Sequence, residues 1–191
     1  GIDSIKWSVN AANPQQAKEL LGISEAMFDM AKQNIEDAYY VRQGAQFKTR
    51  LYASSIKYDE AQVKLMEPFL KREIIPFVDD HYWLPLYTMG GVSTGRSKQL
   101  GFQPVAGNPG RCDAPVDPLP CWTLFTAGHV LSDGRLTACC MDATGRWVMG
   151  DLKTQGFMEC WNSKEFQELR AEHLKLNVIG TKCEKCALVK E

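Results

Sequence analysis

The first 111 residues of this sequence contain no cysteine, although seven cysteines follow in the rest of the chain, at positions 112, 121, 139, 140, 160, 183 and 186. An odd number of cysteines confined to one part of the chain argues against a disulfide scaffold. In a reducing compartment, closely spaced cysteines are more often metal ligands or redox centres. We therefore expect the chemistry of this protein in its second half.

The sequence also has no apolar run that approaches the roughly 20 residues of a membrane span, and its start lacks a charged segment followed by an apolar one. Its 22 basic and 23 acidic residues leave a formal net charge of -1. No broad attraction to nucleic acid or anionic lipid is expected from that balance. We expect a cytoplasmic protein with neither a nucleic-acid nor a membrane partner. The three histidines are dispersed, and each is expected to be structural.

Internal repeats and low-complexity tracts are absent, and the first half alternates between strand and helix patterns. Strands are predicted over residues 4–10 and 47–53, and a third from the segments 77–78 and 82–87 with its end at Gly90-Gly91. Asn13-Pro14 ends the first strand. Helices are predicted from Ser24 to about Arg42 and after Asp59, the second with a kink or break at Pro68. This order predicts an α/β fold with a parallel sheet, as in part of a larger barrel or open sheet.

Glycine and proline are frequent from residue 92 to 120, so we place a linker at 92–111 between a first domain at 1–91 and a second at 112–191. In the second domain, Asp133-Gly134 predicts a hairpin between residues 127–131 and 136–140, with Cys139 on the returning strand. A helix is predicted from Ser163 to about Leu174, preceded by a capping box at Asn162 and Glu165. These elements indicate an α+β domain.

Four cysteines are candidate metal ligands. Cys183 and Cys186 form a CxxC pair, whose spacing lets two thiolates from one turn reach the same metal or cluster. Cys121 and Cys139, one before the hairpin and one on it, would complete a set of four. Soft thiolates without a matching histidine favour zinc or iron–sulfur, and the spacing does not separate the two. Buried structural thiols are the plain alternative. Burial is also expected for Cys112, Cys140 and Cys160, with Cys140 as the substitute for Cys139.

The same residues resemble a known family. Cys121, Gly134, Cys139 and the Cys183-x-x-Cys186 pair are similar to the SPASM or twitch domain of radical S-adenosylmethionine enzymes. Gly150-Asp151-Leu152, Cys160-Trp161-Asn162-Ser163 and Phe166 to Arg170 look like further stretches of that domain. The resemblance implies a small domain in which a β-hairpin and a helix surround an auxiliary 4Fe-4S cluster.

The first half is similar to the last strands of the family's partial (β/α) barrel, with residues 6–10 resembling its fourth strand and residues 84–91 its sixth. This likeness implies that Ser8 lies near the carboxylate of S-adenosylmethionine and that Asn10 lies on the substrate side, although a strand-terminal turn would explain both residues equally well. The sequence resembles only the C-terminal portion of such an enzyme. It lacks the CxxxCxxC motif that holds the catalytic cluster, so we expect no turnover by this chain alone.

The resemblance implies a role in an oxidoreductase-type radical modification of a peptide or small molecule. In it, the auxiliary cluster would serve electron transfer or substrate positioning. The intact parent would also bind S-adenosylmethionine and a second 4Fe-4S cluster, and would receive electrons from a donor such as flavodoxin or ferredoxin. Two alternatives remain at this point: a four-cysteine module with a structural zinc that docks a partner, and a small protein that keeps the cluster for binding or redox sensing without catalysis.

Overall fold

The computed structural model describes residues 2–89, 94–105, 107, 109–117, 119–142 and 144–187. The chain divides into two compact units, Gly1–Leu86 with Arg111–Ala114, and Tyr87–Gly110 with Pro115–Glu191. The sequence had suggested a linker at 92–111. In the structure, the division between the units falls after Leu86. Residues 92–111 include a helix, α4 (Thr94–Gln99). Part of the proposed linker and the predicted strand end at Gly90-Gly91 lie outside the described residues.

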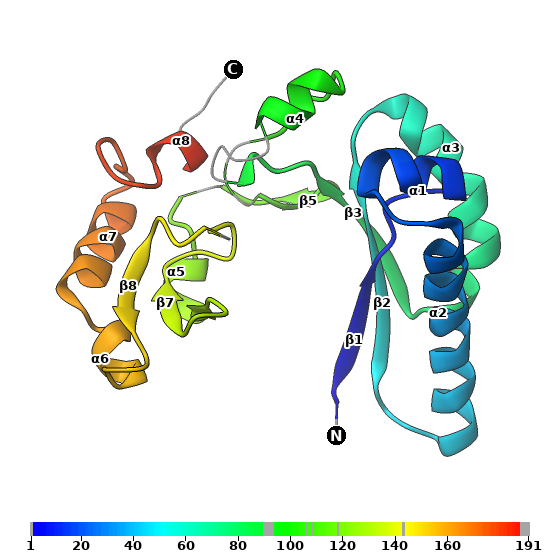
Figure 1. Cartoon of the computed structure of the whole chain (residues 1–191), viewed down its shortest axis with the longest axis horizontal. Helices are drawn as coiled ribbons and strands as arrows, with labels where there is room; N and C mark the ends of the chain where they lie inside the picture. The colour runs from blue at the N-terminus through cyan, green and yellow to red at the C-terminus, as the bar shows by residue number, and fades with distance from the viewer. Residues whose placement is uncertain are drawn as a thin grey trace. The chain divides into compact units, whose positions relative to one another are not determined.

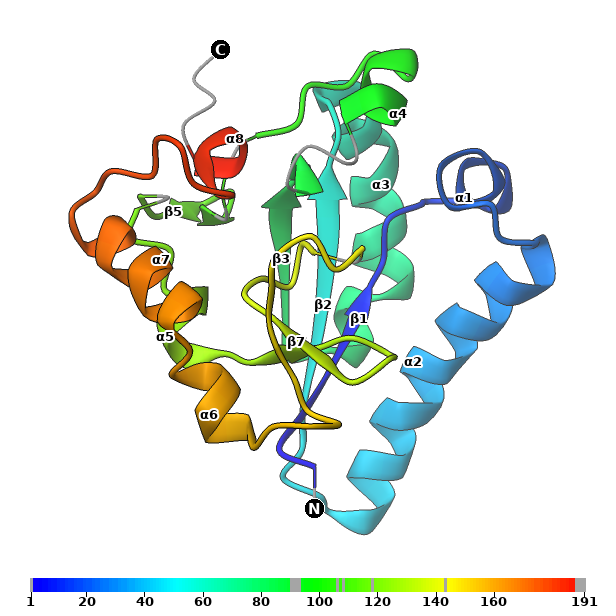
Figure 2. The same cartoon turned by 60° about the vertical axis from the view of Figure 1, so that its left-hand side comes forward.

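The first unit is a three-stranded parallel sheet in the order β1-β2-β3, connected by helices as predicted. Figure 1 and Figure 2 show α2 and α3 running alongside these strands. The elements are, in chain order, β1 (Ser4–Ser8), α1 (Pro14–Leu21), α2 (Glu25–Ala45), β2 (Arg50–Lys57), α3 (Glu60–Glu73), the 3-10 turn η1 (Ile75–Phe77) and β3 (Asp80–Pro85).

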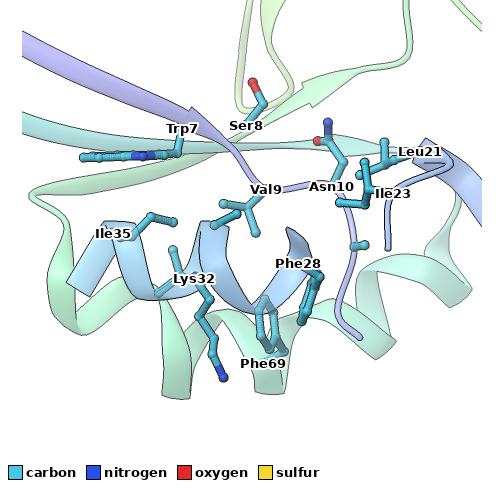
Figure 3. A pocket seen from close by; sticks show the side chains of 13 residues that line it. Trp7, Ser8, Val9, Asn10, Leu21, Ile23, Phe28, Lys32, Ile35 and Phe69 are labelled. Carbon is cyan, nitrogen blue, oxygen red and sulfur yellow. The ribbon is translucent and has the colours of Figure 1, made fainter. Parts of the chain in front are cut away.

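The core of this unit lies between the sheet and its helices. Alternate residues of a strand point to opposite faces, and Trp7 and Val9 pack with Ala53 against Ile35 and Phe69 of the helices. Figure 3 shows Val9 directed toward Phe28 and Phe69 in an apolar cavity of the same unit, whereas the Ser8 side chain points away from these helices. The helix-facing side of the sheet is therefore the apolar one.

Local chemistry explains where the helices of the first unit begin. Ser24 and Asp59 cap α2 and α3 as predicted, accepting hydrogen bonds from the backbone N–H groups of Met27 and Gln62. Helix α1 was not predicted, because Asn13-Pro14 reads as a strand breaker. In the structure, Asn13 is instead the N-cap and Pro14 opens the first turn, a position that proline favours.

Two further details of the first unit differ from the prediction. Strand β2 begins and ends later than residues 47–53, because Ser54 and Ser55 are buried in the central strand, where Ser55 donates a hydrogen bond to the carbonyl of Val9. Helix α3 continues through Pro68, so the break that was one of the two predicted outcomes is absent, while the kink stays a prediction. Pro68 is exposed, so the carbonyl that loses its N–H donor faces the solvent side of the helix.

The second unit contains a small antiparallel sheet in the order β6-β7-β8 with short helices packed on it. The predicted hairpin is confirmed. Gly134 supplies its turn with φ +89, a conformation that glycine adopts without strain. Besides α4, this unit contains α5 (Thr123–Thr126), β6 (His129–Val130), β7 (Arg135–Thr137), β8 (Val148–Asp151), α6 (Phe157–Trp161), α7 (Lys164–Leu174) and α8 (Glu184–Ala187). A separate two-stranded ladder pairs β4 (Gly110–Arg111) with β5 (Ala114–Pro115).

The helices of the second unit are tied together by Arg170. Its Nε donates to the carbonyl of Leu124 at 2.8 Å and its Nη1 to the carbonyl of Trp161 at 2.7 Å, which joins α7 to α5 and α6. The guanidinium carbon also lies 3.9 Å from the ring centroid of Phe166. Helix α7 was predicted, but its N-cap is Ser163 instead of Asn162. None of the helices that the structure describes is both long and apolar enough to cross a membrane.

Candidate metal centre

The four predicted ligands of the second half lie around one cavity in the second unit. Cys121, Cys139, Cys183 and Cys186 all contribute to its lining. Cys140 also lines the cavity, together with Gly107, Thr123, Leu124, Ala138, Met141, Trp147 and His173. Five thiols with mostly apolar neighbours are therefore gathered at one place from three separate segments of the chain.

Cys121 is held by its backbone. Its N–H donates to Nδ1 of His173 at 3.2 Å, and its carbonyl accepts a hydrogen bond from the N–H of Leu124 at 3.2 Å, in the first turn of α5. These two bonds connect the segment before the hairpin to α5 and α7. The position of Cys121 in the cavity is thus set by helices that the sequence places far apart.

Cys139 lies two residues beyond the end of β7, so the prediction that it sits on the returning strand is corrected: it belongs to the turn that follows. Its carbonyl accepts from the N–H of Asp142 at 3.0 Å, and its Sγ accepts from the N–H of Met141 at 3.3 Å. Backbone N–H groups directed at sulfur stabilise the thiolate form, which is the form that binds metals. Its neighbour Cys140, which was expected to be buried, is exposed.

Asp142 holds the turn that carries Cys139. This carboxylate is 1% exposed, and it accepts hydrogen bonds from the hydroxyl of Thr137 at 2.7 Å and from the N–H groups of Arg146 at 2.8 Å and Trp147 at 2.7 Å. Burial works to raise the pKa of Asp142, but these hydrogen bonds together outweigh it and leave the pKa below its ordinary value. Sequence patterns did not identify this residue, because a lone aspartate in a turn has no distinctive spacing.

The CxxC pair is closed by local hydrogen bonds. The carbonyl of Cys183 accepts from the N–H of Cys186 at 3.0 Å, and the N–H of Cys183 donates to Oγ1 of Thr181 at 3.1 Å. Burial raises the pKa of the Cys183 thiol to about 12, with smaller contributions from Cys186 and Cys121.

The neighbouring thiols Cys139 and Cys140 shift each other's pKa in opposite directions. A hydrogen bond between their side chains is the main reason why the pKa of Cys139 is raised and that of Cys140 is lowered, and burial adds to the increase at Cys139. A cationic metal centre would reverse such increases, because thiols lose their protons when they coordinate metals.

Two cysteines lie outside the cavity. Cys160 is 0% exposed within the core of the second unit, as expected from the sequence. Cys112 was also expected to be buried, but it is exposed and belongs to the first unit, where its N–H donates to the carbonyl of Trp83 at 2.9 Å. Its place beside β3 results from the return of residues 111–114 to that unit, which no cysteine spacing indicates.

Ser8 and Asn10 belong to the first unit, and the cysteine cavity belongs to the second. Ser8 ends β1 on the face opposite Trp7 and Val9 and is exposed. Asn10 accepts a hydrogen bond at Oδ1 from the N–H of Ile56 at 2.9 Å and so extends the pairing of β1 with β2. The role of these two residues in binding S-adenosylmethionine stays a prediction.

The donor set around the cavity fits an iron–sulfur cluster. Thiolates are the protein ligands of such clusters, and apolar walls with backbone N–H donors are their usual surroundings. Across the described ranges, no three histidine, cysteine, aspartate or glutamate side chains form a group that could hold a single metal ion. What the four candidate cysteines share is therefore a cavity and not a closed coordination sphere.

The comparisons with known proteins bear on the same segment. No curated protein and no solved structure matches the chain. Residues 121–187 match the family model of the SPASM domain, an iron–sulfur cluster-binding domain. All five cysteines that line the cavity lie within this span. Ser8 and Asn10 lie outside it. The second half of the chain is therefore similar to an iron–sulfur cluster-binding SPASM domain.

Proposed function

We propose that the second unit binds one 4Fe-4S cluster through Cys121, Cys139, Cys183 and Cys186. The observation that carries this proposal is the shared cavity: four cysteines chosen from spacing alone line one apolar cavity in the folded chain. The match of residues 121–187 to an iron–sulfur cluster-binding domain supports it. Four thiolates complete the coordination of one cubane cluster.

Cys139 is the second ligand of this proposal in preference to Cys140. Its sulfur accepts the Met141 N–H and is half-buried, whereas Cys140 is exposed. A ligand thiolate needs both exclusion of water and hydrogen-bond donors to balance its charge. Cys139 meets both conditions, and burial is what distinguishes it from Cys140, because backbone N–H groups also lower the pKa of Cys140.

The bound cluster would accept and donate single electrons, and the protein's part is to exclude water and direct N–H groups at sulfur. With all four irons held by protein thiolates, no iron is left open to bind a substrate directly. Electron transfer is therefore favoured over substrate anchoring. We extend the proposal to an auxiliary role in a radical S-adenosylmethionine enzyme that modifies a peptide or small molecule. The supports for this extension are the sequence resemblance and the parallel sheet of the first unit.

The test is the content of iron, acid-labile sulfide and zinc in anaerobically purified protein, together with its visible absorbance spectrum. The expected result is about four irons and four sulfides per chain with a brown colour. One zinc per chain without sulfide would overturn the proposal in favour of a structural zinc module.

Single substitutions sharpen this test. Cys183→Ser and Cys186→Ser are expected to lose the iron and sulfide, because each removes a proposed ligand. Cys160→Ala is the matched control, since Cys160 is buried in the core away from the cavity lining. Full loading of the Cys183→Ser protein would contradict the ligand assignment.

A further inference from the structure

His173, near the end of α7, is a polar side chain that lines the cysteine cavity and is only 1% exposed. It is separated in the sequence from every cysteine, so no ligand spacing singled it out. Its burial beside Cys121 results from the packing of α7 against the segment that precedes α5. A buried imidazole in such a place needs a partner for each ring nitrogen.

The hydrogen bond at one ring nitrogen determines the state of the other. Nδ1 of His173 accepts from the N–H of Cys121 at 3.2 Å, so Nδ1 carries no proton. The imidazole is then neutral with its proton on Nε2, which makes Nε2–H a donor. Within the part of the chain that the structure describes, this buried Nε2 has no hydrogen-bond partner.

We infer that Nε2–H of His173 donates a hydrogen bond to a sulfur atom of the iron–sulfur cluster, either an inorganic sulfide or a ligand thiolate. The inference rests on the proposed function, because the cluster supplies the acceptor. Of the other cavity-lining residues, Leu124, Ala138 and Trp147 present apolar surface. Apart from the hydroxyl of Thr123, sulfur is thus the side-chain acceptor that the other lining residues bring together.

The hydrogen bond has an electrochemical consequence. A donor at cluster sulfur stabilises the reduced cluster, which carries one more negative charge, and so raises the reduction potential. His173 would therefore tune the cluster and position Cys121 at the same time, through its two ring nitrogens. It would not be a ligand.

The direct test is pulsed EPR on the reduced wild-type protein labelled with 15N-histidine, in H2O and in D2O. We expect a weak coupling from a histidine nitrogen and an exchangeable proton at the cluster. The nitrogen signal should be absent in both His173→Leu and His173→Gln, and the exchangeable-proton signal should be weaker in His173→Leu, where the Met141 N–H remains as a donor at the Cys139 sulfur. A spectroelectrochemical titration should give a more negative midpoint potential for His173→Leu than for the wild type, with His173→Gln between them.

His129 provides the matched control. It lies in the same unit, and its Nε2 is likewise buried without a hydrogen-bond partner in the described residues, but it does not line the cavity. His129→Leu is therefore expected to keep the wild-type coupling and midpoint potential. An equal potential shift in both leucine variants would overturn the inference, because a general loss of stability would then explain the effect.

The outcomes separate this inference from the proposed function. A loaded wild-type protein without any histidine nitrogen coupling overturns the hydrogen bond and leaves cluster binding intact. A coupling as strong as that of an iron-bound nitrogen also overturns it and makes His173 a ligand. A wild-type protein without iron and sulfide overturns both proposals. If His173→Leu does not bind the cluster, the histidine nitrogen coupling of the wild type and the midpoint potential of His173→Gln still test the hydrogen bond.

Discussion

Cys160 of α6 packs directly against the backbone of Gly150 in β8. A Cβ added at Gly150 would lie 2.7 Å from Cβ of Cys160 and 3.1 Å from Oε1 of Gln155. Real Cβ atoms essentially never make contacts below 3.0 Å, so only glycine fits at this position. Because Gly150 has no side chain, α6 can pack closely on the small sheet, and Cys160 is completely buried.

Gly150→Ala is expected to lower the free energy of unfolding by about 1–3 kcal/mol, because the backbone or α6 must move to make room. Denaturant unfolding of the full chain measures this loss. Gly44→Ala in α2 is the control, since nothing lies within 4 Å of a Cβ added at Gly44 and alanine is the better helix former. Equal destabilisation by both substitutions would contradict the steric explanation.

Cys139 and Cys140 are expected to differ in their importance for cluster loading. Cys139→Ser should lose most of the bound iron and sulfide, whereas Cys140→Ser should retain nearly all of it, because Cys139 is the half-buried thiol of the pair. Iron and sulfide analysis of both proteins under identical anaerobic conditions checks this. The reverse result would make Cys140 the ligand.

Asp142→Asn is expected to destabilise the second unit by about 1–3 kcal/mol and to reduce cluster loading. The amide replaces one carboxylate oxygen by a donor, so it cannot accept all three bonds from Thr137, Arg146 and Trp147. Unfolding curves and iron analysis are the measurements. Asp133→Asn in the exposed hairpin turn is the control and should change stability by less than about 1 kcal/mol. If the two variants behaved alike, Asp142 would not anchor the turn.

Asp79 is expected to make the stability of the first unit depend on acidic pH. Burial works to raise the pKa of Asp79, but hydrogen bonds from the Leu51 N–H and the Arg42 guanidinium hold it below its ordinary value. A lowered pKa gives stability that is complete above the unfolded value of about 3.9 and is lost as pH falls through the folded value. Asp79→Asn should cost about 1 kcal/mol at neutral pH and weaken the loss of stability below about pH 4.

The control for this pH dependence is Asp29→Asn, which changes an exposed carboxylate on α2. Unfolding free energies from about pH 3 to pH 7 for the three proteins provide the comparison. Asp29→Asn should follow the wild-type curve, and Asp79→Asn should be flatter than both at the acidic end. Parallel curves for all three would show that another group causes the acid sensitivity.

Local signals were sufficient for most of the elements. Side-chain caps at Ser24 and Asp59, the Asp133-Gly134 turn and the helical spacing after Ser163 act over a few residues, so they can be recognised without the fold. The errors arose where tertiary context outweighs local preference. Ser54 and Ser55 continue β2 because they lie in the central strand, and Pro68 stays in α3 because it faces solvent.

By itself, the sequence determined which thiols are candidate ligands, because the CxxC spacing and the hairpin glycine are properties of neighbouring residues. Only the tertiary structure decided that Cys121 and Cys139 reach the same cavity as that pair, that Cys112 belongs to the other unit, and that His173 stands beside the thiols. These relationships depend on contacts between residues far apart in the chain. Such contacts are formed by the burial of apolar side chains around Arg170 and Phe166, which no local pattern encodes.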